Sequence, residues 1–518
     1  MAKKSIRLEY SGLIIFVAYL ISIITGLIFT FMVARASYKI YTVSGVQHTE
    51  LDLWVNINDV VPYFLLMSGV LPFWVMRSVA REKGGATKTG IIANLIISAV
   101  ATLAYLAFIP FITSALGVSG TYLLVYFLMA IEILEYYSIN VLEAYFQAKI
   151  PQTVGYGMLV QQVFKVIIGY LIIVRLDQPL VGAVVGTLAG FAVQIVYYSR
   201  LIAEELKQRI EWGQVKEWLK ASTATIYNVV GSQIAAYIFI MLFQYGGANG
   251  RSIFYVATAV TAVITYSEYL AYALYPKLLA EKRREDITTS LRMVLMFAIP
   301  MTIGAIALSN SLIVLLVPDY SFAGPVLIVL AIDAFVTAVS SVLGSVITGF
   351  ETIDERGQLS LRRLVKSRLW MAFSLPYLHS AVTLPTAYYV LTRYAYHQPY
   401  YAALYVSIIN SSGHFAMFLI QYAIVRKMTK ISAPWRSAAK YTFAGAVMGA
   451  LLYLIPHTTR LPVTLAMTVL GAVIYFPLLM AIDKEARTLP RNVMNEIRRR
   501  TKKTETEQPR TRRPQSIR

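Results

Sequence analysis

The stretch LWVNINDVVPYFLLMSGVLPFWVMRSVAREK (Leu53–Lys83) can be laid without a gap on IFYVATAVTAVITYSEYLAYALYPKLLAEKR (Ile253–Arg283). Trp54 then meets Phe254, and the charged exits AREK and AEKR coincide. Each stretch is apolar over roughly the 20 residues that a helix needs to cross a bilayer, and each ends in a basic segment. The pair predicts a chain made of two similar halves, each built from membrane-spanning helices.

The composition of the chain is that of a membrane protein. Of its 518 residues, 57% are hydrophobic and 14% are charged, and the mean hydropathy is +0.59. Repeated apolar runs of about 20 residues are typical of polytopic helical membrane proteins. The sequence has no cysteine, which excludes disulfides, thiol catalysis and cysteine-held metals, and none of its five histidines forms an HExxH pair. We therefore expect neither a metal site nor a cofactor.

We predict an all-α, polytopic fold with about 14 transmembrane helices. The spans are expected at residues 11–34, 53–76, 90–114, 121–147, 153–174, 179–199, 222–246, 252–275, 289–309, 324–350, 369–391, 401–425, 438–456 and 461–483. The segment Arg200–Lys220 interleaves apolar and charged residues at helical spacing, which predicts an interfacial helix on the inner leaflet. This helix separates six spans from the rest, as in transporters with a parallel repeat, which place the substrate path between two lobes.

These features predict five domains. They are an N-terminal six-helix lobe (1–199), an interfacial linker helix (200–220), a C-terminal six-helix lobe (221–425), an appended two-helix segment (426–483) and a basic cytoplasmic tail (484–518), which we expect to be disordered.

The distribution of basic residues predicts the orientation. Forty of the 47 Lys and Arg residues lie in or at the edge of segments on the same side as the N-terminus, and six lie on the other side. We therefore expect a multi-pass protein of the cell (plasma) membrane with both termini in the cytoplasm. The net charge of +20 would then face the anionic lipids of the inner leaflet. Because the basic residues are scattered over short loops, nucleic-acid binding is not expected.

Four segments, in order, carry a resemblance to a known family. They are SGLIIFVAYLISIITGLIFTFMVARAS (Ser11–Ser37), FWVMRSVAREKGGATKTGI (Phe73–Ile91), FQAKIPQTVGYGMLVQQVFKVIIGYLII (Phe146–Ile173) and IPMTIGAIALSNSLIVLLVPDYSFAGPVLIVLAI (Ile299–Ile332). Over roughly residues 8–480 the chain resembles the polysaccharide-biosynthesis (O-antigen and lipid-linked oligosaccharide) flippases of the multidrug/oligosaccharidyl-lipid/polysaccharide exporter superfamily. The resemblance implies two six-helix lobes, a central cavity and export of a polyprenyl- or dolichyl-phosphate-linked glycan to the outer leaflet.

A line of carboxylates runs along the predicted span 121–147. Glu132 and Glu143 are eleven residues apart, three helical turns, and Glu135 lies one turn from Glu132 on nearly the same face. Lys165, in the antiparallel fifth span, lies at a depth similar to that of Glu132. Glu132, Glu135 and Lys165 either form an ion pair that holds two spans together, or line the cavity and bind glycan hydroxyls or a coupling proton. Glu143, about one turn from the inner end, is expected to reach the headgroups.

Three charged residues near the ends of the first two spans are candidates for a phosphate site. Arg35 either anchors phosphate or extends to the headgroups, and Asp59 is its expected partner. Arg77 either meets phosphate arriving from the inner leaflet or is an ordinary positive-inside residue, and we favour the second.

Six polar residues in the second half complete the candidates. Glu268 and Asp333 carry isolated carboxylates, and the sequence leaves open whether each one faces the cavity. The amides of Asn228 and Gln233 either line the cavity or form hydrogen bonds between helices. Two histidines, His379 and His414, are expected to be packing groups rather than proton carriers.

Three function classes compete. The first is a flippase for a lipid-linked oligosaccharide, whose other partners would be membrane lipids and, where an ion gradient drives transport, a coupling ion. The second is a cation-coupled exporter of small molecules from the same superfamily, for which the carboxylate line would be the coupling site. The third, a membrane glycosyltransferase, would need a substantial loop carrying catalytic groups, whereas the predicted outer loops rarely exceed about a dozen residues. We therefore do not expect an enzyme.

Overall fold

The structure of the protein is a computed structural model. It describes residues 8–36, 40–43, 46–115, 118, 120–316, 322–351, 364–429, 434–455 and 461–488. Each of the 14 predicted spans coincides with a helix or with two consecutive helices, and ten stretches of the described chain are long and apolar enough to cross a membrane. The protein is a multi-pass, all-α membrane protein, as predicted.

Seven α-helices form the first part of the chain. The elements are α1 (Leu8–Ala36), β1 (Ile40–Val43), β2 (Val46–Thr49), α2 (Glu50–Leu65), α3 (Val70–Ala80), α4 (Ala86–Ala115), the 3₁₀ turn η1 (Gly120–Tyr122), α5 (Leu123–Lys149), α6 (Gln152–Tyr170), the π-helical turn η2 (Leu171–Arg175) and α7 (Pro179–Leu201). The antiparallel β1–β2 hairpin pairs Ile40 with Thr49, and the sequence did not predict it.

The second part of the chain is also helical. Its elements are η3 (Glu205–Lys207), α8 (Trp212–Thr265), the 3₁₀ turn η4 (Tyr266–Ala271), α9 (Leu274–Glu281), α10 (Glu285–Ala307), α11 (Ser309–Leu316), α12 (Gly324–Gly349), α14 (Arg368–Arg393), α15 (Pro399–Met428), α16 (Trp435–Leu454) and α17 (Leu461–Ile482). Within α8, Gly247 has φ 77° and ψ 173°, a conformation that favours glycine. This residue turns the chain between the predicted seventh and eighth spans.

The predicted linker helix is wrong in one respect. Residues 200–220 do not form a single helix, because α7 ends at Leu201 and α8 begins at Trp212. Between them, the Gln208 side chain accepts a hydrogen bond from Gly85 N at 2.6 Å, and Glu211 N donates to Thr89 Oγ1 at 2.8 Å. These bonds hold the connection against the start of α4 rather than leaving it as an independent amphipathic helix.

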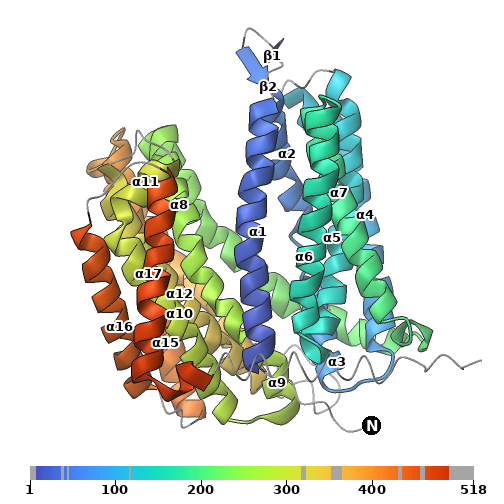
Figure 1. Cartoon of the computed structure of the whole chain (residues 1–518). Coiled ribbons are helices and arrows are strands. Elements are labelled where there is room, and N and C mark those ends of the chain that lie inside the picture. Colours follow the sequence, from blue (N-terminus) through green and yellow to red (C-terminus); the bar gives the residue numbers. More distant parts are fainter. Residues whose placement is uncertain are drawn as a thin grey trace, which may run out of the picture.

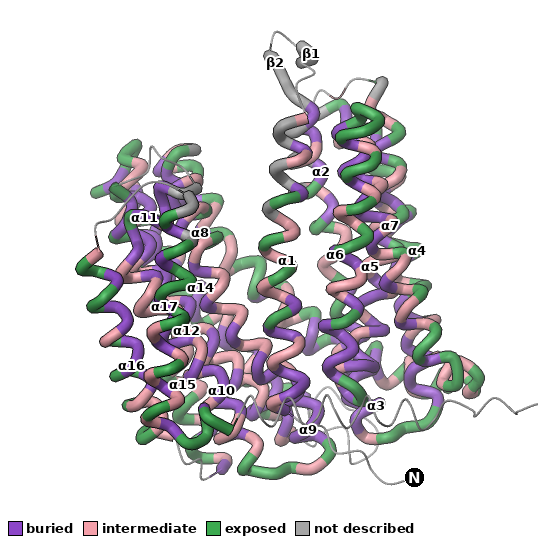
Figure 2. Tube along the Cα trace, viewed as in Figure 1, coloured by how far each residue is buried: buried purple, intermediate pink, exposed green. Residues whose placement is uncertain are grey.

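Figure 1 shows two helical bodies, one containing α2 to α7 and the other α10 to α17. They lie apart at the end that carries the β1–β2 hairpin and come together at the end near the N-terminus. The buried residues follow this arrangement (Figure 2). One core cluster lies inside each body near the hairpin end, whereas the cluster containing Trp74, Phe146 and Leu369 joins both bodies near α3. We call these bodies lobes, and the region where they meet the closed end.

The second span of each half is broken at the same place in the internal repeat. The first break lies between α2 and α3 at residues 66–69, and the second lies at η4, 200 residues later. Each break is followed by a helix with a proline in its first turn, Pro72 in α3 and Pro276 in α9. A proline there needs no partner for its missing N–H, but it cannot continue a preceding helix. The coincidence of the two breaks supports the repeat that the sequence predicts.

A buried arginine joins the lobes at the closed end. Arg77 is fully buried, and its Nη1 donates to Tyr275 Oη at 3.0 Å and to the Thr348 carbonyl at 2.9 Å. Its Nη2 donates to the Glu351 carbonyl at 2.8 Å, which also accepts a bond from Arg81 at 2.9 Å. These carbonyls lie at the C-terminal end of α12, where the helix dipole is negative. Two guanidinium groups of the first lobe therefore hold the end of a helix in the second.

We expect Arg77→Met to loosen the closed end, because a buried carbonyl left without its donor costs about 1–3 kcal/mol. Ser345 lines the space behind this contact. Since the sequence has no cysteine, Ser345→Cys provides a single reporter, whose labelling by a membrane-impermeant maleimide from the side of the N-terminus should speed up about tenfold in the Arg77→Met background. Lys149→Met, at an exposed residue, is the matched control. Equal labelling rates in the two backgrounds would contradict the role assigned to Arg77.

Candidate functional site

A cavity of about 470 Å³ lies between the lobes next to the closed end. Residues of α3, α5, α12, α14 and α15 line it, together with Tyr272 and Tyr275. Three of its polar groups come from α5, where Asn140, Glu143 and Gln147 follow one another at intervals of three and four residues. This spacing places them on one face of the helix. The cavity therefore has a polar wall on the first lobe.

Glu143 is the charged group of this wall. Its Oε1 accepts a hydrogen bond from Gln194 Nε2 at 3.1 Å and lies 3.3 Å from the Tyr198 hydroxyl. Gln194 and Tyr198 belong to α7, and both are buried. Glu143 thus lies in the lobe interface rather than at the headgroups, which corrects our expectation from the sequence. The reason is tertiary, since the second lobe covers the end of α5 that hydropathy alone places near the membrane surface.

A group of tyrosines faces this region from the other side. The rings of Tyr19 on α1 and Tyr269 on η4 stack with centroids 3.7 Å apart. Tyr266 and Tyr272 lie on either side of Tyr269, with centroids 5.8 and 6.0 Å from it. A 3₁₀ helix has three residues per turn, so side chains three residues apart lie above one another. The break in the eighth span therefore converts the spacing of three tyrosines into a column of rings.

One hydrogen bond links the polar wall to the tyrosine column. Gln147 Nε2 donates to the Tyr272 carbonyl at 3.2 Å, from α5 in one lobe to the other lobe. The wall supplies donors and acceptors, and the column supplies aromatic faces with hydroxyl groups. Together they can bind a ligand that carries both polar groups and flat apolar faces.

The carboxylates deeper along α5 do not form the direct ion pair that was one of the two alternatives left open by the sequence. Glu132 and Lys165 attract each other electrostatically, but no ion pair within 4.0 Å joins them among the described residues. Lys165 Nζ instead lies 4.5 Å from the ring centroid of Phe29, a cation–π contact. One carboxylate oxygen each of Glu132 and Glu135 is buried without a hydrogen bond in the described chain. Helix α7 packs against both α5 and α6, which limits direct contact between them.

The second lobe contains a separate polar cluster. Asp333 Oδ1 on α12 lies 2.8 Å from His414 Nδ1 on α15. The His379 ring, on α14, stacks on that of His414 with centroids 5.0 Å apart. The structure therefore brings together three of the sequence candidates, but inside the second lobe and away from the polar wall.

The remaining candidates do not converge. Glu268 lies next to Ser341, and Asn228 is half-buried on α8. Gln233 lines a different hollow between the lobes. Arg35 is in α1 and Asp59 is in α2, but their side chains lie outside the described residues, so the roles expected for them stay predictions.

Sequence reasoning missed the tyrosine column, misplaced Glu143 and wrongly favoured an ordinary positive-inside role for Arg77, which is buried against the end of α12. A signal for the first was present, because Tyr266, Tyr269 and Tyr272 repeat every three residues, a period that fits neither an α-helix nor a strand. For Glu143, the amides of Asn140 and Gln147 one turn on either side indicate a continuous polar face. An acid that only extends to the headgroups needs no such neighbours.

Comparison with known proteins supports the fold. No protein-family model matches the chain, and no curated protein matches its sequence. Among solved structures, a MATE in the straight conformation is similar with a TM-score of 0.65 and 14% identity, covering 82% of this chain and 100% of that one. An outward-facing multidrug resistance MATE family transporter of the MOP superfamily is similar with a TM-score of 0.62 and 14% identity, covering 82% and 96%.

A third similar structure is a MOP superfamily transporter from Pyrococcus furiosus, for which a reversed polarity of the binding pocket is described as suggesting a different function. Its TM-score is 0.61 and its identity 14%, covering 81% of this chain and 95% of that one. At such identities the likeness shows that the chain has the fold of these transporters.

The geometry around Lys165 predicts weak coupling between it and Glu132. For the free energy of unfolding in detergent, we expect the double-mutant cycle of Glu132→Gln and Lys165→Met to give an interaction energy of about 0.5 kcal/mol, at the lower end of the range for coupled residues, because the two charges attract each other without a direct ion pair. The cycle of Lys165→Met with Phe29→Leu should give more, since these two side chains touch. A larger coupling in the first cycle than in the second would contradict the arrangement described.

Proposed function

We propose that this protein is a flippase that moves a lipid-linked oligosaccharide across the membrane by alternating access between its two lobes. The observation that carries the proposal is the inter-lobe cavity, with its polar wall on α5, the tyrosine column that reaches it at Tyr272 and its closure by Arg77. The transporter fold and the ordered resemblance of the sequence to oligosaccharide flippases support it further.

The chemistry of the cavity suits a glycan. A sugar cannot cross hydrocarbon, because its hydroxyls would lose their hydrogen bonds, at a cost of several kcal/mol for each one left without a partner. Asn140, Glu143 and Gln147 offer both donors and acceptors for hydroxyls. The Tyr272 ring and its neighbours offer apolar faces that can cover the carbon face of a sugar ring. The glycan would thus exchange its hydration for the polar wall while it crosses.

The charge of the cavity limits where phosphate can lie. Among the described residues that line the cavity, the charged side chain is Glu143, and the guanidinium groups of Arg77 and Arg81 at the closed end are already bound to carbonyls of the second lobe. A phosphate next to Glu143 would meet a like charge in a region of low dielectric, which is costly. We therefore place the glycan, and not the phosphate, at the polar wall.

The direction of transport follows from the orientation proposed for the chain. With both termini in the cytoplasm, the closed end faces inward, and the hairpin end faces outward. The structure would then correspond to the state that releases cargo to the outer leaflet. The Asp333–His414 pair in the second lobe is our candidate site for a coupling ion, because it places a carboxylate beside an imidazole within the membrane-spanning part of the chain.

The second candidate function is export of an organic cation. The specific observation in its favour is the combination of Glu143 with the tyrosine column, since aromatic rings around a carboxylate attract quaternary ammonium groups. A cation exporter would require the negative charge of Glu143, whereas a glycan requires only its hydrogen bonds. The two functions therefore differ in their response to replacement of that charge.

Transport in proteoliposomes separates the two functions. We expect the purified protein to move a fluorescent lipid-linked oligosaccharide between leaflets, and Glu143→Gln, which keeps one acceptor and loses the charge, to slow it by about threefold to tenfold. Glu143→Leu, which removes all polar groups, should abolish it. Glu204→Gln, an exposed surface acid, is the matched control.

The same transport measurement gives a different result for a cation exporter. If the wild-type protein moves tetraphenylphosphonium but no lipid-linked oligosaccharide, and if Glu143→Gln abolishes that movement, the flippase proposal is overturned in favour of the cation exporter.

A further inference from the structure

The internal repeat gives the lobes two equivalent seams, but the two seams are built from different side chains. One seam, which we call the tyrosine seam, joins α1 to η4 through the stacked rings of Tyr19 and Tyr269. By the 200-residue offset of the repeat, its counterpart is the contact between the first half of α8 and the break at residues 66–69. At this second seam Leu66 takes the place of Tyr266, and Gly69 takes the place of Tyr269.

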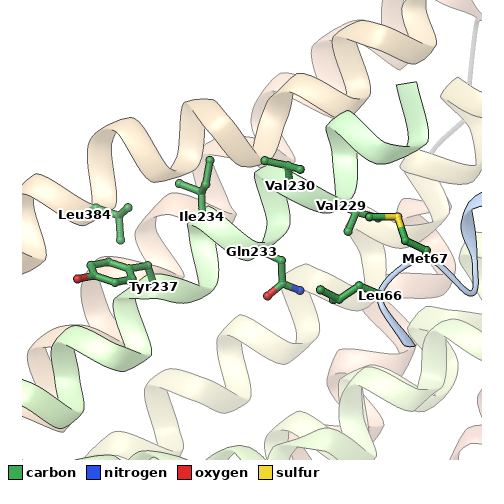
Figure 3. Close-up of a pocket in the computed structure, with 8 residues that line it drawn as sticks. All are labelled: Leu66, Met67, Val229, Val230, Gln233, Ile234, Tyr237 and Leu384. Carbon is green, nitrogen blue, oxygen red and sulfur yellow. The ribbon is translucent and has the colours of Figure 1, made fainter. Parts of the chain in front are cut away.

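The second seam contains a hollow of about 410 Å³. Figure 3 shows Leu66 and Met67 reaching toward α8 beside Val229 and Gln233, with Tyr237 close to Leu384 of α14. The lining is apolar except for the Gln233 amide and the Tyr237 hydroxyl. We call this feature the apolar seam. Its volume lies within the range of about 300–1,000 Å³ typical of ligand sites.

Gly69, three residues after Leu66 of the apolar seam, leaves open the place that a tyrosine ring takes at the tyrosine seam. A Cβ built on Gly69 meets no atom within 4 Å, so the space beside it is open. The backbone there is ordinary, with φ −92° and ψ −5°, and does not itself require glycine. At the tyrosine seam a large ring fills the equivalent place. The repeat thus supplies two equivalent openings, of which tyrosines seal one.

The apolar seam and the inter-lobe cavity are lined by neighbouring residues of the second span, at a depth that lies within the bilayer. Gly69 lines the cavity, and Leu66 and Met67, only a few residues before it, line the hollow. Leu66 follows the 16 residues of α2, about 24 Å along the helix axis from the hairpin end. With the hydrocarbon core about 30 Å thick, this depth lies between the two surfaces. Side chains of the hollow, such as Val230 and Ile234, are 43% and 41% exposed.

We propose that the apolar seam is the site where the long isoprenoid chain of the cargo leaves the protein for the bilayer while the glycan occupies the cavity. This inference rests on the proposed flippase function and specifies how the lipid part of the substrate is bound. The cargo has a polar head and an apolar tail, and withdrawing the tail from lipid costs about 0.8 kcal/mol per CH₂. The tail must therefore pass sideways through one of the two seams throughout the crossing.

The two seams differ in their suitability for this passage. At the tyrosine seam a tail would have to separate the stacked rings of Tyr19 and Tyr269 and would lie against tyrosine hydroxyls. At the apolar seam it meets aliphatic side chains and an open space, and the attached head can reach the polar wall past Gly69. The Gln233 amide lies at this passage and can donate to the phosphate oxygens at the junction of head and tail.

The first experiment closes the apolar seam. The double variant Gly69→Tyr, Leu66→Tyr gives the apolar seam the two residues, Tyr266 and Tyr269, that stand at the equivalent places of the tyrosine seam. In proteoliposomes we expect this variant to slow translocation of an oligosaccharide on a long isoprenoid carrier at least tenfold, with a smaller effect on the same oligosaccharide carried on two isoprene units. Ile24→Tyr, at a 59% exposed position of α1, should leave both rates unchanged.

The second experiment uses the wild-type protein and does not depend on the folding of a variant. An isoprenoid phosphate bearing a diazirine in its chain is photolysed in proteoliposomes, and the adducts are mapped by mass spectrometry. We expect adducts concentrated at residues 66–67 and 229–237, and competed by unlabelled isoprenoid phosphate but not by excess phospholipid. Adducts concentrated at α1 and η4, or spread evenly over the lipid-facing surface, would overturn the proposal.

The two proposals fail in different ways. If the wild-type protein translocates the long-carrier oligosaccharide while closing the apolar seam has no effect, the tail passes elsewhere and only the further inference falls. If the wild-type protein moves no lipid-linked oligosaccharide at all, the flippase function falls, and the tail site falls with it.

Discussion

The burial of the Arg77 guanidinium at the end of α12 is the constraint on which the arrangement of the lobes depends. A permanent charge in this position is tolerated only because carbonyl groups and a tyrosine hydroxyl of the opposite lobe surround it. Arg77 lies on α3, which the break after α2 releases from the rest of the span. The orientation of α3, the closure between the lobes and the position of the cavity behind it therefore follow from one set of hydrogen bonds.

The carboxylates of α5 are costly in a membrane unless other groups form hydrogen bonds with them. Glu143 has two such groups, Gln194 and Tyr198 of the neighbouring helix α7. Glu132 and Glu135 each leave one oxygen without a partner in the described chain, so they depend on water or on cargo for the remainder of their hydrogen bonds. The carboxylates of α5 thus differ in how far neighbouring side chains satisfy them, and Glu143 at the closed end is the one bound by two side chains of α7.

The sequence predicts the helices well and the contacts between them poorly, for one physical reason. Span positions depend on local hydropathy, and the predicted spans coincide with helices from α1 to α17. The helical phase of α5 is local too, which is why the line of carboxylates could be recognised. The depth of Glu143 and the partners of Arg77 and Lys165 depend instead on residues up to 274 positions away. The β1–β2 hairpin was missed because a short pairing beside an apolar span leaves no periodic signal long enough to detect.

The broken second spans have a mechanical consequence. A continuous helix transmits bending from one end to the other, so a displacement of the chain at one membrane surface would also displace it at the opposite surface. Here α2 and α3 share only a short turn, and the second half of α8 is separated from α9 by η4. Each half therefore contains a joint in the same place, and the closed end can be locked or released without forcing the outer helices to tilt by the same angle. In each half, the closed end and the hairpin end are therefore carried by separate helices on either side of the break.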